Sequence, residues 1–460
     1  MPVEVANSGE DTQHSPQTLL NLSKRLKLSK IWKVGGRAGL AALSLALGLT
    51  VGVGAILVVA RVSEAPALFL FSGLAGFALI AAGGAVLVTR GLAPVSRRQW
   101  RLGYSGVAAG IALAGTLALL IPLGDPATPA AAVPGQRFWN LPTGSRIAYV
   151  KIAAVGTSKP TPIIFVHGGP GFAQMATDAP FFGQLSRDGY DVYLYDQIGA
   201  GLSPRLDDPT KYTVARAAAD LEAIRQQIGV GRVILIGHSW GGSVIATYLA
   251  QHPDHVARVV FSSPGAVYWP EMGTGGMGMV GRLTSAQRWE VISKLLPPRA
   301  LLAYGLVQVN PRAAHAFAGD RELDARYDQI FASAAPGLFC DVHNPPPGEA
   351  LTGVGFYANQ VPQSASAARP EDPRPALRAI RTPALVLKGS CDYIPWRLTM
   401  EYRDTLPNTQ FVYLRHAGHQ AYQEQPDAYL ATVRAFLEGE PLPVQPYQGH
   451  EPPADYSGVR

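Results

Sequence analysis

The sequence predicts an α/β domain with a doubly wound, mostly parallel sheet, preceded by an all-α transmembrane region. Three observations support this. Residues 233–242 join an apolar, β-forming run to a Gly-x-Ser-x-Gly turn and then to helix-forming residues. Beyond residue 137, short apolar strands alternate with helical patterns, which is typical of a parallel sheet. Nearer the N-terminus, three long segments contain no charged residue.

The first 36 residues are predicted to form a cytoplasmic tail that is basic toward its end. Residues 1–23 are polar and contain no Lys or Arg, so we expect them to be disordered. Residues 1–101 contain eleven Lys and Arg against four Asp and Glu, whereas the rest of the chain contains 28 against 29. A nucleic-acid groove would need basic residues over the folded domain. We therefore expect no nucleic-acid partner.

Three transmembrane helices are predicted within residues 37–124. The uncharged runs are 38–60, 65–89 and 103–123. At about 1.5 Å per residue, each run can cross a hydrocarbon core roughly 30 Å thick, so the lipid bilayer is an expected partner.

The orientation of these helices is predicted from the basic residues around them. Six basic residues precede the first run and four separate the second from the third, against one between the first and second. Because Lys and Arg concentrate on the cytoplasmic side, we expect an integral protein of the cell membrane with a cytoplasmic N-terminus and an extracytoplasmic catalytic domain. Cleavage after the third run, near Ala130–Ala132, is the alternative.

The α/β core is predicted in two parts separated by an inserted cap. We expect a Pro- and Ala-rich linker at 125–136, the first part of the core at 137–263, the cap at 264–373, the second part of the core at 374–440 and a Pro-rich tail at 441–460. Strands are predicted at 147–152, 162–166, 192–195, 233–236, 256–262, 384–388 and 411–414, and helices at 213–228 and 426–438. The cap region contains several short helical patterns between loops.

Ser239 is the candidate nucleophile. The strand-to-helix turn forces it into a strained conformation, so glycines are needed two residues before and after it. This places the hydroxyl at a helix N-terminus, where the backbone N–H of Trp240 can stabilise a developing oxyanion. A second donor is expected from Gly168 or Gly169, in a glycine-rich loop that follows an apolar strand.

Asp392 and His419 are the candidate orienting acid and base. Hydrolases with this serine turn place an acid and then a histidine after the serine in the chain. Both residues follow the carboxyl ends of successive predicted strands, where open α/β sheets place their sites. His416 is the alternative base. Because the base must be neutral, we expect activity to fall below roughly pH 6.

Together these motifs resemble the α/β-hydrolase fold and, within it, the proline iminopeptidase family of serine peptidases. The loop His167-Gly168-Gly169-Pro170-Gly171, the stretch Asp-Gln-Ile-Gly-Ala-Gly-Leu-Ser at 196–203 and Ser-Trp-Gly at 239–241 are similar to hallmark motifs of that family. The resemblance spans about residues 137–438 and implies the same roles for Ser239, Asp392, His419 and the oxyanion donors. It departs from the family at Ile198, where Arg is usual, and at His238, where Gly is usual.

The substrate is less well defined by the sequence. The resemblance implies an aminopeptidase that binds the free amine of its substrate through cap glutamates in a Trp-Glu-Gly context, which this chain lacks. Four cap acids are candidate substitutes: Glu271, Glu290, Glu322 and Asp341. The expected substrate is a small peptide, an amide or an ester, cleaved through an acyl-enzyme. An esterase on the same residues and a non-catalytic ligand receptor are the alternatives.

Only two cysteines, Cys340 and Cys391, are present. Without a Cys-x-x-Cys or a His-rich tract they predict no metal site, and we expect no cofactor. In an oxidising compartment they can pair and join the cap to the core, or they can be two separate buried thiols.

Overall fold

The computed structural model describes residues 16–124, 130–273, 277–346 and 352–460. Two compact units divide the chain: residues 60–66 and 118–460 form the larger one, and the remaining residues before 118 form the other. Parts of the predicted tail, linker and cap, at 1–15, 125–129, 274–276 and 347–351, lie outside the described residues.

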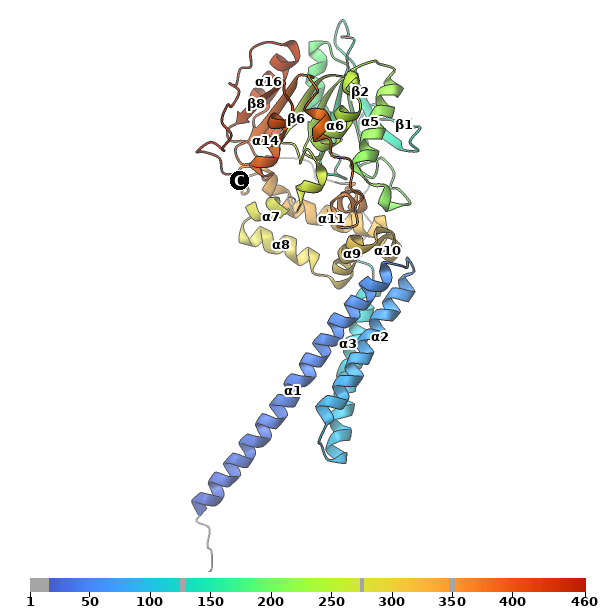
Figure 1. Cartoon of the computed structure of the whole chain (residues 1–460), viewed down its shortest axis with the longest axis vertical. Helices are drawn as coiled ribbons and strands as arrows, with labels where there is room; N and C mark the ends of the chain where they lie inside the picture. The colour runs from blue at the N-terminus through green and yellow to red at the C-terminus, as the bar shows by residue number, and fades with distance from the viewer. Residues whose placement is uncertain (1–15, 125–129, 274–276, 347–351) are drawn as a thin grey trace, which may run out of the picture. The chain divides into compact units, whose positions relative to one another are not determined.

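The smaller unit consists of three long helices, α1 (Pro16–Ala60), α2 (Pro66–Thr89) and α3 (Pro94–Leu120) (Figure 1). The segment Val34–Ala60, α2 and α3 are long and apolar enough to cross a membrane. The predicted boundaries were partly wrong, because α1 begins at Pro16, inside the segment expected to be disordered, and α3 begins well before residue 103. Proline favours the first turn of a helix, which explains both starts.

The larger unit contains one eight-stranded sheet. Its strands are β1 (Arg137–Asn140), β2 (Arg146–Ile152), β3 (Ile163–Val166), β4 (Val192–Tyr195), β5 (Val233–His238), β6 (Val256–Ser262), β7 (Ala384–Gly389) and β8 (Thr409–Leu414). Their order is β1-β2-β4-β3-β5-β6-β7-β8. From β4 to β8 all neighbours are parallel, and β1 and β2 form an antiparallel edge. The predicted mostly parallel sheet is confirmed.

Helices cover both faces of this sheet. They are α4 (Met175–Phe182), α5 (Val214–Ile228), α6 (Trp240–Gln251), α13 (Arg374–Leu377), α14 (Trp396–Thr405), α15 (Ala421–Glu424) and α16 (Pro426–Glu438). In β3, Ile164 and Val166 belong to the core with α5, α6 and α14, whereas Ile163 and Phe165 belong to the core with α4, α15 and α16. Because strand side chains alternate between faces, the sheet has a separate apolar core on each side.

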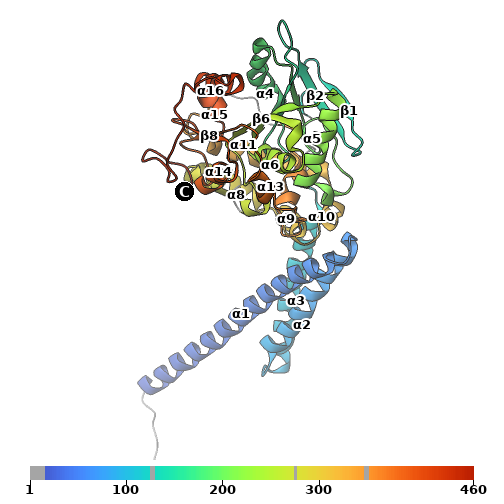
Figure 2. The same ribbon diagram turned by 45° about the horizontal axis from the view of Figure 1, so that its top comes forward.

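Six helices of the inserted region lie between β6 and β7. They are α7 (Met277–Arg282), α8 (Ser285–Leu295), α9 (Pro298–Val309), α10 (Pro311–Phe317), α11 (Asp320–Ala334) and α12 (Phe356–Gln360). Figure 1 shows α8 to α11 together beyond one end of the sheet, and Figure 2 again shows α9 and α10 side by side there. Short 3₁₀ turns complete the unit, at Gly183–Asp188, Pro209–Lys211, Pro253–His255, Trp269–Met272, Ala335–Leu338 and Val361–Gln363.

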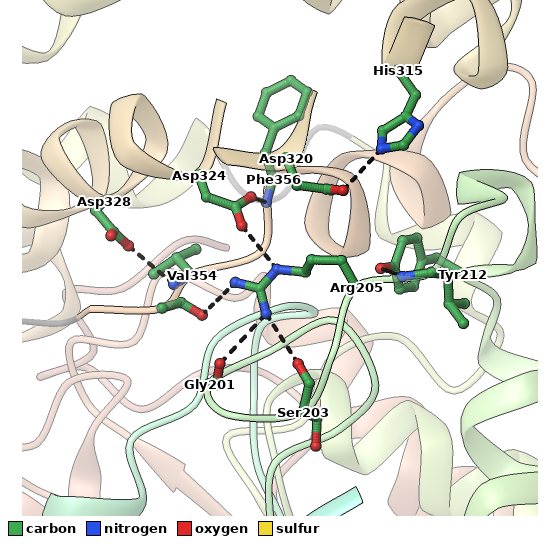
Figure 3. A network of polar contacts seen from close by, with 12 residues as sticks. Gly201, Ser203, Arg205, Tyr212, His315, Asp320, Asp324, Asp328, Val354 and Phe356 are labelled. Atoms are coloured by element: carbon green, nitrogen blue, oxygen red, sulfur yellow. Dashed lines mark hydrogen bonds and ion pairs between the residues drawn. The ribbon is translucent and has the colours of Figure 1, made fainter. Parts of the chain in front are cut away.

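An ion pair and a disulfide are among the connections that join this cap to the core. Arg205, just past the Asp-Gln stretch, donates to Asp324 of α11 at 2.8 Å and to the Gly353 carbonyl at 3.1 Å (Figure 3). Cys340 and Cys391 form a disulfide with their Cα atoms 5.2 Å apart, so the two thiols are paired. The cap is therefore held at the loops that follow β4 and β7.

The C-terminal residues 441–460, which were predicted to be a Pro-rich tail, pack against the hydrolase domain. Leu442 and Tyr456 are buried. The N–H of Val459 donates to the Asp392 carbonyl at 3.2 Å, and the Val459 carbonyl accepts from the Trp396 N–H at 2.9 Å. This segment thus lies along the loop that contains the candidate acid.

Candidate active site

Ser239 lies in a sharp turn between β5 and α6. Its backbone has φ 55° and ψ −120°, a region that L-residues rarely adopt. A Cβ at Gly237 would lie 2.6 Å from Ile245 Cδ1, and one at Gly241 would overlap the Val166 carbonyl. Both glycines are therefore required by close approach of strand and helix, as the motif predicts.

Asp392 and His419 meet in the loops that follow β7 and β8. The His419 Nδ1 lies 2.9 Å from Asp392 Oδ1, and Asp392 also accepts from the Ile394 N–H at 3.0 Å. Burial raises the pKa of Asp392, but the charges of Lys388 and His419 and these hydrogen bonds outweigh it, so the pKa lies below its ordinary value. The acid is therefore ionised beside the histidine.

Of the two candidate bases, only His419 contacts Asp392 among the contacts of the described residues. The side chain of His419 is 3% exposed and lines the same pocket as Ser239. His416 is exposed, and its backbone is in the left-handed region at φ 53°. The geometry favours His419.

The pocket around Ser239 is mostly neutral. Its lining consists of His167, Gly168, Gly169, Phe172, Gln174, His238, Ser239, Phe331, Leu338, Tyr393, His419 and Gln420. The aromatic rings give it apolar walls, and the Gln420 side chain donates to Gln174 Oε1 at 3.2 Å. The two glutamines are pocket residues that the sequence analysis missed, and nothing in their local pattern marks them.

The glycine-rich loop lies directly beside the nucleophile. A Cβ at Gly168 would be 3.0 Å from Ser239 Cβ. Burial lowers the pKa of His167 to about 4, so this side chain is neutral and its Nε2 accepts from the Gln197 N–H at 2.9 Å. The Gln197 side chain donates to the His167 carbonyl at 2.8 Å and accepts from Trp240 Nε1 at 2.9 Å. Gln197 thus fixes the loop relative to the serine turn.

None of the four predicted cap acids lines this pocket. Their partners lie elsewhere: Glu271 pairs with Arg374, Glu290 with Lys294, and Glu322 with Arg299, while Asp341 accepts from the backbone of His343 and Asn344. The side chains of Glu271 and Glu290 are 42% and 57% exposed. Each carboxylate is satisfied locally, so the structure does not support the prediction that, in an aminopeptidase, one of these four acids reaches the Ser239 pocket.

Lys388 is a charged residue near the site that the sequence analysis did not single out. It lies in β7 with no exposed surface, and its Nζ donates to Asp392 Oδ2 at 3.0 Å and to the Ile394 carbonyl at 2.6 Å. A signal for it was present, because it is the only charged residue in the otherwise apolar run 384–389.

One group of possible metal ligands occurs among the described residues. Side-chain atoms of Glu222, His252 and His255 lie within 4.8 Å of one another. Glu222 already accepts from Arg225 at 2.6 Å and from the Tyr248 hydroxyl at 2.8 Å. These bonds occupy the carboxylate, and none of the three residues lines the Ser239 pocket. We assign no metal to this group.

Comparisons with known proteins agree with the topology. A family profile described as alpha/beta hydrolase fold matches residues 161–295. The proline iminopeptidase of Heyndrickxia coagulans is 27% identical over 315 residues, covering 64% of this chain and 96% of that protein. The proline iminopeptidase of Lactobacillus delbrueckii subsp. bulgaricus is 26% identical, covering 65% of this chain and 96% of that protein.

A solved structure is also similar. The proline iminopeptidase of Mycobacterium smegmatis is 20% identical, with a TM-score of 0.43, and covers 66% of this chain and 98% of that one. The family profile and the sheet order together establish the α/β-hydrolase fold. The chain is a hydrolase of this fold, with homologues among the proline iminopeptidases.

Proposed function

We propose that Ser239 is the nucleophile of this hydrolase, with His419 as its general base and Asp392 as the acid that orients His419. The observation that supports this most directly is the His419–Asp392 hydrogen bond at the edge of the pocket that contains Ser239. The backbone N–H groups of Gly168 or Gly169 and of Trp240 are the proposed oxyanion donors. They lie on the loop beside Ser239 and at the start of α6.

The proposed reaction proceeds through an acyl-enzyme. Ser239 Oγ attacks the substrate carbonyl carbon while His419 takes the hydroxyl proton, and the oxyanion donors stabilise the tetrahedral intermediate. When the bond to the leaving group breaks, His419 gives the proton to the departing amine or alkoxide. Water then attacks the acyl carbon, His419 takes one of its protons and returns it to Ser239, and the acid product leaves.

We propose an aminopeptidase of the proline iminopeptidase type as the leading activity, because the curated relatives have that name. A free substrate amine needs a carboxylate, since a buried unpaired cation is strongly disfavoured. The acid we propose is Asp328 of the cap helix α11, which does not itself line the pocket and whose carboxylate is directed toward Val354 (Figure 3). It lies one helical turn before Phe331, which lines the pocket, and next to Tyr327, whose ring is 5.7 Å from that of Phe172.

The protonation of Asp328 makes this assignment testable. Burial raises its pKa to about 6, and one of its oxygens accepts from the Val354 N–H at 3.0 Å. A carboxyl with a raised pKa is charged above that pH and neutral below it. Binding of a cationic amine should therefore weaken as the pH falls through 6, whereas binding of a neutral substrate should not.

We expect Asp328→Asn to raise KM for free aminoacyl amides by roughly 100-fold, because loss of one partner of a buried ion pair costs about 3 kcal/mol or more. N-acetylated analogues should be unaffected. The measurement is a steady-state comparison of free and N-acetylated prolyl amides with the full-length protein in detergent. Glu290→Gln, which removes an exposed acid paired with Lys294, is the matched control. Equal rates on free and blocked substrates in the parent enzyme would rule out an amine site.

An esterase is the second candidate function. The observation that favours it is the lining of the pocket, where the described residues include no carboxylate. In that case short neutral esters are cleaved faster than any aminoacyl amide, and Asp328→Asn changes neither rate. The same substrate panel therefore separates the two activities.

We also propose that the three apolar helices anchor the enzyme in the cell membrane with the hydrolase domain outside the cytoplasm. The distribution of Lys and Arg supports this orientation. The Cys340–Cys391 disulfide is in keeping with it, because such bonds persist in oxidising compartments.

Reporter fusions test this topology. A reporter that is active only outside the cytoplasm should be active when it is fused after Pro134 and inactive when it is fused near Pro94. A cytoplasmic reporter should give the opposite pattern at the two positions. Activity of the extracytoplasmic reporter at Pro94 alone would overturn the proposed orientation.

A further inference from the structure

Lys388 is an unusual residue at its position in the sheet. Lysine is almost never fully buried unless it is paired, and this side chain lies in β7 with no exposed surface. Its Nζ contacts two acceptors, Asp392 Oδ2 and the Ile394 carbonyl. The mechanism above uses neither the charge nor the hydrogen bonds of Lys388.

The two oxygens of Asp392 have different partners. Oδ1 accepts from the Ile394 N–H and faces His419 Nδ1, whereas Oδ2 accepts from Lys388. Burial holds the pKa of Lys388 below its ordinary value, although the charge of Asp392 and the hydrogen bond to it oppose this shift. The carboxylate of Asp392 thus lies between the ammonium group of Lys388 and the imidazole ring of His419. We call these three buried residues the buried row.

We propose that Lys388 is a positioning residue that fixes Asp392 against His419 and, through its positive charge, extends the activity of the enzyme to lower pH. This inference rests on the proposed roles of Asp392 and His419. With Lys388 charged, the carboxylate is already neutralised when His419 becomes protonated, so protonation adds a net positive charge to a buried site. Without Lys388, the same protonation would neutralise Asp392 and become easier.

The size of this effect follows from Coulomb's law. Two charges that flank one carboxylate are on the order of 6 Å apart, and at an effective dielectric constant of about 20 their interaction corresponds to nearly two pH units. Removing the charge should therefore move the acid limb of the pH–rate profile upward by about one to two units. It should not alter substrate binding, because Lys388 does not line the pocket.

Other titratable groups surround this row. They are His238 at the end of β5, Tyr393 in the acid loop, Arg282 of α7, Glu424 of α15 and Tyr456 of the C-terminal segment. Burial keeps His238 neutral by lowering its pKa, and it raises the pKa of both tyrosines. Burial also raises the pKa of Glu424 above its ordinary value.

The test is the rate of covalent labelling by a fluorophosphonate, measured from pH 4.5 to 9 on the full-length protein. This probe needs no knowledge of the substrate and reacts only with an activated serine. Lys388→Gln retains a hydrogen-bond donor but removes the charge. We expect its acid limb to move upward by about one to two units, so that labelling at pH 5 falls by roughly ten- to a hundredfold, with a smaller change above pH 8.

Three further variants separate charge from structure. Lys388→Arg keeps the charge and should retain the acid limb of the parent, even if its absolute rate is lower. Lys151→Gln, which removes a lysine from the exposed pair with Asp191, should leave the profile unchanged. Repeating Lys388→Gln in a Glu424→Gln background should give the same displacement, because Glu424 is not its source.

The outcomes decide between a positioning and a purely structural role. An unmoved acid limb in folded Lys388→Gln, or a displaced limb in Lys388→Arg, overturns the proposal, and the Arg result decides even if the Gln variant does not fold. Loss of thermal stability with an unchanged limb shows a structural role only. If the parent is not labelled at all, the proposed nucleophile fails as well, which distinguishes that failure from one confined to Lys388.

Discussion

Ser239→Ala is expected to lower turnover by roughly 10⁶, because serine, histidine and acid act as a unit and loss of the nucleophile removes the covalent route. Fluorophosphonate labelling should disappear with it. The fold should be preserved, since Ala occupies the same strained turn with one atom fewer. The measurement is hydrolysis of the best substrate in the panel by the purified full-length protein.

The matched control is Ser293→Ala on cap helix α8. This serine is on the cap surface, and among the described residues its hydroxyl donates only to the Glu290 carbonyl. It should retain full activity and full labelling. If Ser239→Ala keeps even a few per cent of the parent activity, then Ser239 is not the nucleophile.

His419→Ala is expected to cause a loss of similar size. His419 is the proposed acceptor of the serine proton. Among the described side chains that line the pocket, no other histidine is bonded to Asp392 and could replace it. The expected result is a fall in kcat of roughly 10⁵ to 10⁶ with little change in KM, measured on the same substrate.

His416→Ala provides an internal control from the same loop. Because His416 is exposed, we expect its replacement to change kcat by less than about threefold. The reverse pattern, with His416 essential and His419 dispensable, would overturn the assignment of the base. Since, of these two histidines, only His419 contacts Asp392 among the described residues, such a result would also separate Asp392 from the catalytic machinery.

Much of the core could be predicted because its signals are local. Each parallel strand is a short apolar run, and the Gly-x-Ser-x-Gly turn is defined by sterics within a few residues. The order of Ser239, Asp392 and His419 placed the acid and the base at neighbouring strand ends, and the structure brings those two together at 2.9 Å. Their catalytic roles stay predictions until the variants are measured.

The roles of the acidic residues in the cap could not be predicted in this way. Whether an acid faces the pocket or the solvent depends on which basic residue folding places beside it, and that partner is often distant in the chain. Glu271 pairs with Arg374 across 103 residues, and Glu322 pairs with Arg299 on a different helix. A sequence shows the acids but not these pairings, so all four candidates were plausible and none lines the pocket.

The C-terminal segment and Lys388 were missed for a related reason. A Pro-rich composition predicts an extended chain but not its contacts, and here the backbone of Val459 bonds to the acid loop. A lysine within an apolar run is usually predicted to point from the exposed face of a strand into solvent. Only the three-dimensional arrangement shows that Asp392 lies beside it.

The disulfide supplies an internal measure of folding for all the variants above. The chain has only two cysteines, and their Cα atoms come within bonding distance only when the cap segment and the loop after β7, 51 residues apart, have docked. A molecule in which the two segments have docked and oxidised has no free thiol, whereas one in which they never docked keeps two. Counting alkylated cysteines under denaturing conditions therefore gives the fraction of each preparation in which the cap and the core have become joined, and a variant with the parent's count has passed this folding step.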